Sequence, residues 1–168
     1  MDAPYSFSNQ LEPVAKKAVL KANVYFLDYP EAGKITCYKN LSCFIDTGAG
    51  GTFIHEEYLK NKNWNFEAPI KYNKCSNSSG AGGTFASYHI PNTLIQLKKT
   101  ENLEATDMPD GTGFDPVILQ TNPRSDYDLI IGNNILATCT FIYDGINNSY
   151  LLNVFPNGGI KTISTGRY

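Results

Sequence analysis

The feature that most constrains this chain is a series of short apolar stretches separated by glycine, proline, asparagine and aspartate. Nine such stretches occur, at residues 24–29, 35–38, 43–45, 85–90, 93–97, 117–120, 129–131, 141–143 and 150–154. Many short strands punctuated by turn residues are typical of a small barrel or sandwich, so we predict an all-β fold. Helix candidates are few: residues 133–137 are predicted to form one short helix capped by an Asn, and residues 55–59 a single turn.

Composition and charge exclude several classes of protein. Hydrophobic residues make up 42% of the 168 residues and charged residues only 18%, which argues against a disordered chain. A net charge of −2 lacks the excess of positive charge that is typical of nucleic-acid-binding proteins, so we expect no nucleic-acid partner. The apolar runs are too short to span a membrane. Residues 1–20 lack the unbroken apolar core of a secretory signal, so we expect a protein that is not secreted.

The potential metal ligands show no ligand spacing. The chain has four cysteines and two histidines: Cys37, Cys43, Cys75, Cys139, His55 and His89. No C-x-x-C pair occurs, so we expect no metal site, no cofactor and reduced thiols in a cytosolic setting. The acidic stretch at residues 100–115 is interpreted as a solvated surface loop, with a substrate-contacting insertion as the alternative.

The main chemical signal is an aspartate directly after an apolar run. Phe44 and Ile45 are predicted to be buried, which places Asp46 where a core strand ends. Burying a lone carboxylate is unfavourable by several kcal/mol, roughly, unless it is paired or shares a proton. Thr47 supplies a hydroxyl, and Gly48 lets the backbone turn and approach another group closely. By itself Asp-Thr-Gly is weak evidence, because an ordinary strand-ending turn can carry the same residues.

Two further motifs follow along the chain, and together with Asp-Thr-Gly they favour a functional motif over an ordinary turn. Residues 79–85 form a glycine-rich tip between strand-like residues, without the lysine and helix that a phosphate-binding loop needs, so we interpret it as a hairpin tip. Residues 127–136 then place an apolar strand that ends in Gly132 and runs into the short predicted helix.

In this order the three motifs resemble a retropepsin, the aspartic protease of retroviruses and related elements. The resemblance covers roughly residues 22–155. Residues 130–134, with residues 116–120 upstream, are similar to the proteases of plant pararetroviruses of the caulimovirus, badnavirus and tungrovirus type. Gly50, Asn133 and Ala81 depart from common retroviral residues, which concerns substrate contacts and the flap, not the catalytic carboxylate.

The resemblance implies a fold and a role for each motif. The implied fold is an all-β retropepsin-like acid-protease fold, with a closed barrel-like subunit, a flap hairpin and one short C-terminal helix. The implied residues are Asp46 as the catalytic carboxylate, Thr47, Gly48 and Ala49 as support of its loop, Gly80, Ala81, Gly82 and Gly83 as the flap, and Ile130, Ile131, Gly132 and Asn133 as the closing strand and helix.

The chain carries one Asp-Thr-Gly, whereas peptide hydrolysis of this type needs two carboxylates around one water. The resemblance therefore implies a homodimer in which Asp46 of each subunit meets at the two-fold axis, acting on a peptide or polyprotein without metal or covalent intermediate. The implied activity is that of an aspartic endopeptidase in viral polyprotein processing, located in the host cytoplasm or the virion.

Two alternatives stay open at this point. One is a retropepsin-like dimerisation or interaction domain without proteolysis, and the other is a retrotransposon-derived or cellular protease of the same type. For the domain organisation we expect a flexible arm or linker at residues 1–21, the protease domain at 22–156 and a C-terminal extension at 157–168.

Overall fold

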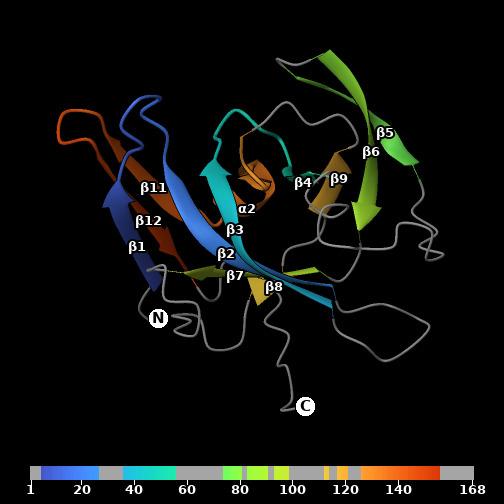
Figure 1. The fold of residues 1–168 in the computed structure, drawn as a ribbon, viewed down its shortest axis with the longest axis horizontal. Coiled ribbons are helices and arrows are strands. Elements are labelled where there is room, and N and C mark those ends of the chain that lie inside the picture. Colours follow the sequence, from blue (N-terminus) through green and yellow to red (C-terminus); the bar gives the residue numbers. More distant parts are fainter. Residues whose placement is uncertain are drawn as a thin grey trace, which may run out of the picture.

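A computed structural model describes residues 5–26, 36–55, 74–80, 83–90, 93–98, 112–113, 117–120 and 126–155 of the chain. These residues form strands and a single short helix (Figure 1). In chain order the elements are β1 (Tyr5–Gln10), β2 (Val19–Phe26), β3 (Thr36–Ile45), β4 (Thr52–His55), β5 (Lys74–Gly80), β6 (Gly83–Ile90), β7 (Thr93–Lys98), β8 (Thr112–Gly113), β9 (Val117–Gln120), β10 (Leu129–Ile131), α2 (Asn133–Leu136), β11 (Cys139–Asp144) and β12 (Ser149–Val154). Within the described ranges, no helix has the length and apolarity of a membrane span.

Most strands belong to one nine-stranded sheet with the order β5-β6-β9-β4-β10-β3-β2-β7-β8. Its central feature is β10, which lies between β3 and β4, parallel to the first and antiparallel to the second. The chain therefore leaves β3, crosses the end of β10 and enters β4. This crossing places residues 46–51 directly above the end of β10.

The core follows from the alternation of side chains along these strands. In β3, Leu41, Cys43 and Ile45 are buried, while the residues between them are partly exposed. Leu129 and Ile131 of β10 are also buried, as expected for a short apolar strand with a neighbour on each side. These side chains pack together in one hydrophobic cluster, which fixes the end of β3.

A second sheet with the order β1-β12-β11 packs its inner face onto the same cluster. Here the structure corrects the prediction of a flexible arm at residues 1–21. Tyr5–Gln10 pairs antiparallel with Ser149–Val154, and Phe7 and Leu11 are buried. The prediction located strands by runs of apolar residues, and the polar residues around Phe7 interrupt any such run. Residues 157–168 lie outside the described residues.

Strand β3 also differs from the prediction, which separates the stretches at residues 35–38 and 43–45 by turn residues. The strand is continuous, and Asn40 has a φ of 59° beside a register shift between Ala22 and Val24 of β2. The Asn40 backbone N–H donates to Asn23 Oδ1 at 3.1 Å. An asparagine tolerates the left-handed conformation that such an irregularity requires, so the strand continues where the sequence indicates a break.

The retropepsin-like, all-β prediction is confirmed, with the flap hairpin β5–β6 and the short helix α2 in place. The large sheet is a half-barrel, because β5 and β8 end its order and do not pair with each other in the described residues. The prediction of an Asn cap is wrong: Gly132 caps α2 and no side chain caps it. His55 belongs to β4, and residues 56–59 of the predicted single turn lie outside the described residues.

Candidate active site

Asp46 is the first residue after β3, and its loop is closed by hydrogen bonds of its own. The Asp46 N–H donates to the Ile131 carbonyl oxygen at 3.0 Å, which extends the β3–β10 pairing by one residue. The Gly48 N–H donates to Asp46 Oδ1 at 2.9 Å, and the Ala49 N–H donates to the Asp46 carbonyl oxygen at 3.2 Å. The half-buried carboxylate is thus fixed through one oxygen by the backbone of its own turn.

The tip of this loop is open in the single chain. Thr47, Gly48 and Gly50 are exposed. A Cβ at Gly48 would lie 3.2 Å from Asp46 Oδ1, so glycine permits the short hydrogen bond that holds the carboxylate.

The start of α2 supports the loop from behind. The Asn133 N–H donates to the Ala49 carbonyl oxygen at 2.7 Å, and Asn133 Nδ2 donates to the Thr47 carbonyl oxygen at 3.0 Å. Gly132 approaches the same loop so closely that a Cβ there would overlap the Gly51 carbonyl oxygen and lie 2.8 Å from that of Ala49. The structure therefore brings Gly132 and Asn133 to the Asp46 loop, as the order of motifs predicts. Ile130 and Ile131 lie behind them in β10.

Sequence reasoning missed a second support, which passes through Thr52. This fully buried side chain donates from Oγ1 to Asn134 Oδ1 at 2.8 Å and accepts from the Gly132 N–H at 3.2 Å. One hydroxyl thereby links the far end of the active-site loop to α2. The only sequence signal is a threonine at the start of an otherwise apolar strand, which does not say which backbone group it meets.

Asp128 is a structural carboxylate. Its Oδ2 accepts from the Ser42 N–H at 2.8 Å, and its backbone N–H donates to the Ser42 carbonyl oxygen at 3.0 Å. These bonds hold β3 and β10 together at the end opposite to Asp46, so Asp128 fixes the register of the two parallel strands.

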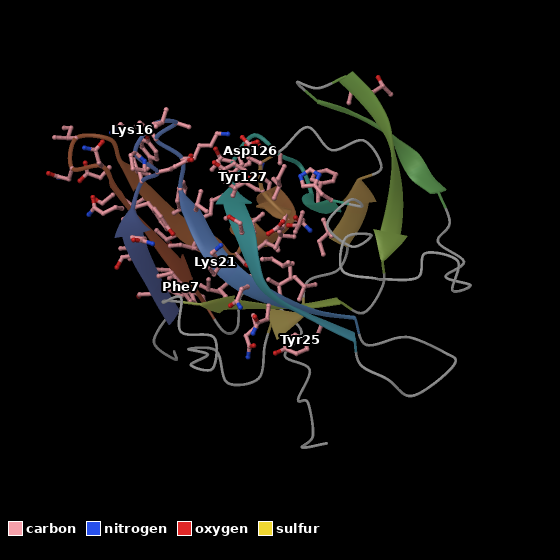
Figure 2. The ribbon with its side chains drawn as sticks, in the orientation of Figure 1. Phe7, Lys16, Lys21, Tyr25, Asp126 and Tyr127 are labelled. Carbon is pink, nitrogen blue, oxygen red and sulfur yellow. The ribbon has the colours of Figure 1, made fainter. Side chains whose placement is uncertain are left out.

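A cation–π cluster joins the turn between β1 and β2 to the strand that carries Asp46. Lys17 Nζ lies 5.0 Å from the ring centre of Phe44 and 4.9 Å from that of Tyr127, and the two rings stack at 5.3 Å. Tyr127 also donates from its hydroxyl to Glu12 Oε2 at 2.8 Å. Burial and the Glu12 hydrogen bond raise the pKa of Tyr127 to about 12. Figure 2 shows Tyr127 near the end of β3 and Lys16 in the turn between β1 and β2.

The predicted flap is the β5–β6 hairpin, which stands apart from the loop after β3 in Figure 1. Gly80 pairs with Gly83, and the exposed hydroxyls of Ser79 and Thr84 lie 3.3 Å apart. Gly83 has a φ of +105°, which side-chain-bearing residues rarely adopt. Ala81 and Gly82 lie outside the described residues.

Among the described residues, the potential metal ligands lie scattered. Within the part of the chain that the structure describes, no three His, Cys, Asp or Glu side chains are placed to hold a metal ion. Cys43 and Cys139 are free thiols, and burial raises the pKa of both. The group that the Asp46 loop presents is a carboxylate held by the backbone of its own turn.

Comparisons with known proteins place the fold. No protein-family model matches the chain, and no curated protein matches its sequence. Among solved structures, it is similar to a retropepsin-like aspartic protease from Rickettsia conorii, with a TM-score of 0.54, 11% identity, and coverage of 88% of this chain and 98% of that one. An EIAV protease bound to the inhibitor HBY-793 aligns with a TM-score of 0.41 and 15% identity over 75% of this chain and 90% of that one. The chain thus has a retropepsin-like aspartic protease fold.

Proposed function

We propose that the protein is an aspartic endopeptidase of the retropepsin type and that Asp46 is its catalytic residue. The observation that carries this proposal is the Asp46 turn. Its carboxylate follows a core strand, accepts the Gly48 N–H, and sits in a loop that Gly132 and Asn133 support from behind. Such rigid support is what a catalytic carboxylate needs, because a small displacement of a reacting group lowers the rate steeply.

The proposed catalytic unit is a dyad of two Asp46 side chains, one from each of two subunits. Two carboxylates about 3 Å apart cannot both be ionised, so they share one proton, as the two carboxyl groups of aspartic proteases do. The ionised Asp46 takes a proton from the water that attacks the peptide carbonyl. The neutral Asp46 donates a hydrogen bond to the developing gem-diol. The exposed loop tip, Thr47 and Gly48, leaves room for a second subunit at this position.

The proposed substrate is a polyprotein that the hairpin from Gly80 to Gly83 covers while water is excluded. A viral polyprotein of the plant pararetrovirus type, processed in the host cytoplasm or virion, is the specific form of this proposal. It rests on the likeness of residues 130–134 and 116–120 to those proteases. A retrotransposon-derived or cellular protease is the alternative source.

The competing proposal is an interaction domain that uses the same fold without proteolysis. The retained Asp46-Thr47-Gly48 turn favours the enzyme, because a pure dimerisation domain gains nothing from a half-buried carboxylate.

The test is hydrolysis of peptides that span candidate polyprotein junctions. The parent should cleave them and should be inhibited by a statine-type compound, whose hydroxyl resembles the gem-diol. Asp46→Asn should be inactive yet folded, because Asn preserves the shape but cannot act as the base. Asp126→Asn, the same change at an exposed aspartate, is the matched control and should retain activity. Equal cleavage by Asp46→Asn and parent would refute the proposal, and loss of cleavage on adding a chelator would indicate a metal mechanism instead.

A further inference from the structure

The peptide group between Thr47 and Gly48 lies at the exposed tip of the active-site loop and is hydrogen-bonded at both of its ends. Its N–H, which belongs to Gly48, donates to Asp46 Oδ1 at 2.9 Å. Its carbonyl oxygen, which belongs to Thr47, accepts from Asn133 Nδ2 at 3.0 Å. One planar group therefore connects the side-chain amide at the start of α2 to the carboxylate directly after β3.

This peptide group depends on such a restraint more than a buried one would. Thr47 and Gly48 are exposed, so core packing does not fix the group. Glycine also permits a wide range of backbone conformations, so little steric hindrance opposes rotation of the peptide plane on its side. That rotation would turn the N–H away from Asp46 Oδ1. The hydrogen bond that Asn133 donates to the carbonyl oxygen opposes it.

Asn133 is itself held in place by contacts that do not involve its side chain. Its backbone N–H donates to the Ala49 carbonyl oxygen at 2.7 Å, and its carbonyl oxygen accepts from the Ala137 N–H at 2.9 Å. Ile135 and Leu136, on the same short helix, are buried in the core. The amide of Asn133 thus reaches the exposed loop tip from a fixed base.

The two hydrogen bonds also strengthen each other electrostatically. A donor at the carbonyl oxygen of a peptide group polarises that group and makes its N–H a better donor. The N–H of Gly48 donates to a carboxylate, and hydrogen bonds to an ionised acceptor are stronger than those between neutral groups. The amide of Asn133 therefore favours the orientation in which the ionised Asp46 is held by its own turn.

We propose that Asn133 is a positioning residue that holds the Asp46 carboxylate in place through the peptide group between Thr47 and Gly48. The effect on rate rests on the proposed function, because Asp46 is then the group that takes the proton from water. Asn133 acts in this role through another residue. Its side chain should therefore matter for the catalytic step and not for the binding of substrate.

The test is the kinetics of Asn133→Ala, which removes the side-chain amide and keeps the backbone hydrogen bond to Ala49. The value of kcat should fall by about tenfold with KM unchanged, because the reacting carboxylate is less well positioned. Asn133→Asp has the same size without the donor. An acidic residue suits the first turn of a helix, so this variant should fold and should lower kcat as well.

Asn147→Ala is the matched control. Asn147 Nδ2 donates to Asp144 Oδ2 at 2.7 Å in the exposed turn between β11 and β12, so this change removes a hydrogen bond of the same kind outside the active-site loop. It should leave kcat unchanged. Its melting temperature should change about as little as that of Asn133→Ala, since both hydrogen bonds are exposed.

The NMR resonance of the Gly48 amide proton measures the same contact without activity. It should lie at lower field in the parent than in Asn133→Ala, because its hydrogen bond is stronger in the parent. A parent that cleaves no peptide, but whose Gly48 resonance moves upfield on the substitution, would refute the protease proposal and support the positioning contact. An unmoved resonance, or an active parent whose kcat Asn133→Ala leaves unchanged, overturns the inference, and the parent's own activity then decides the protease proposal.

Discussion

The active-site loop and the flap hairpin are both glycine-rich, yet their surroundings differ completely. Residues 46–51 share hydrogen bonds or close contacts with Ile131, Gly132 and Asn133, which lie at the end of β10 and the start of α2, distant in sequence. The described end of the flap is held within its own hairpin, by the pairing of Gly80 with Gly83 and the Ser79–Thr84 hydroxyl contact.

The comparison shows that glycines in similar turns serve different physical needs. Gly132 is required by a close approach to backbone, and Gly83 by its positive φ. Gly50, in the active-site loop itself, has neither restraint, since a Cβ there would meet nothing within 4 Å. Substitutions at these three positions therefore test the contrast directly.

The largest effect is expected from Gly132→Ala. Its Cβ would overlap the Gly51 backbone, so the active-site loop must shift, with a loss of about 3 kcal/mol in the free energy of unfolding and nearly all activity. Gly50→Ala is the control in the same loop and should change neither quantity by much. Denaturant unfolding and peptide hydrolysis measure both, and equal effects of the two substitutions would show that the close approach does not matter.

The next effect is expected from Thr52→Val, which keeps the volume of the side chain but removes its hydroxyl. The buried Gly132 N–H then loses its acceptor, and the protein should lose about 2 kcal/mol of stability. Thr52→Ser retains the hydroxyl and should recover activity more fully than Val does. If Val is the better replacement, packing and not the hydrogen bond holds the loop to α2.

A smaller effect on stability is expected from Gly83→Val in the flap. The φ of +105° disfavours a β-branched residue by about 1 kcal/mol, and we expect the catalytic rate to fall more than stability does. Thr84→Ser, at the neighbouring exposed strand position, keeps the hydroxyl that contacts Ser79 and should leave both unchanged. A lower melting temperature of Gly83→Val with an unaltered catalytic rate would show that this hairpin contributes to stability and not to catalysis.

The smallest effect concerns His55, at the other end of β4 from Thr52. Its ring is 3% exposed and neither ring nitrogen has a hydrogen-bond partner among the described residues. Burial lowers the pKa of His55, so the unfolded chain takes up its proton first as the pH falls below about 6.5. Acid should therefore destabilise the fold through this residue, and the effect is absent above that pH.

His55→Leu removes that titration. The free energy of unfolding should depend on pH in the same way for the parent and His55→Leu above neutrality. In acid the two should differ, because the variant keeps more of its stability. His89→Leu is the comparison at the other histidine of the chain. An identical acid response of parent and His55→Leu would show that the buried imidazole does not weaken the strand beside the active-site loop.

Part of the fold could be predicted because β9 and β10 are almost entirely apolar. The bounds of β9 and β10 match the predicted residues 117–120 and 129–131. β1 could not be predicted from periodicity, because a single buried Phe7 among polar residues becomes a strand through pairing with β12. Similarly, the irregularity at Asn40 depends on Asn23 of the neighbouring strand and has no local signature.

The candidate site was likewise predictable only in part. Asp46, Gly132 and Asn133 could be predicted from the order of motifs, and the structure brings them together. The link through Thr52 and Asn134 could not, because a threonine in a strand gives no sign of the backbone group that it will meet. Sequence patterns thus predict which residues meet at the Asp46 loop, while the supporting contacts depend on the crossing of β3, β10 and β4.

The central claim, that each active site uses two copies of Asp46, is tested most directly by mixing subunits. Parent and Asp46→Asn chains are combined in varying ratios at a constant total concentration at which the protein is dimeric, and peptide hydrolysis is measured after subunit exchange. Only dimers with two intact Asp46 residues should be active, so activity should fall with the square of the parent fraction. Activity that falls in direct proportion to the parent fraction would show that one Asp46 suffices and would contradict the account.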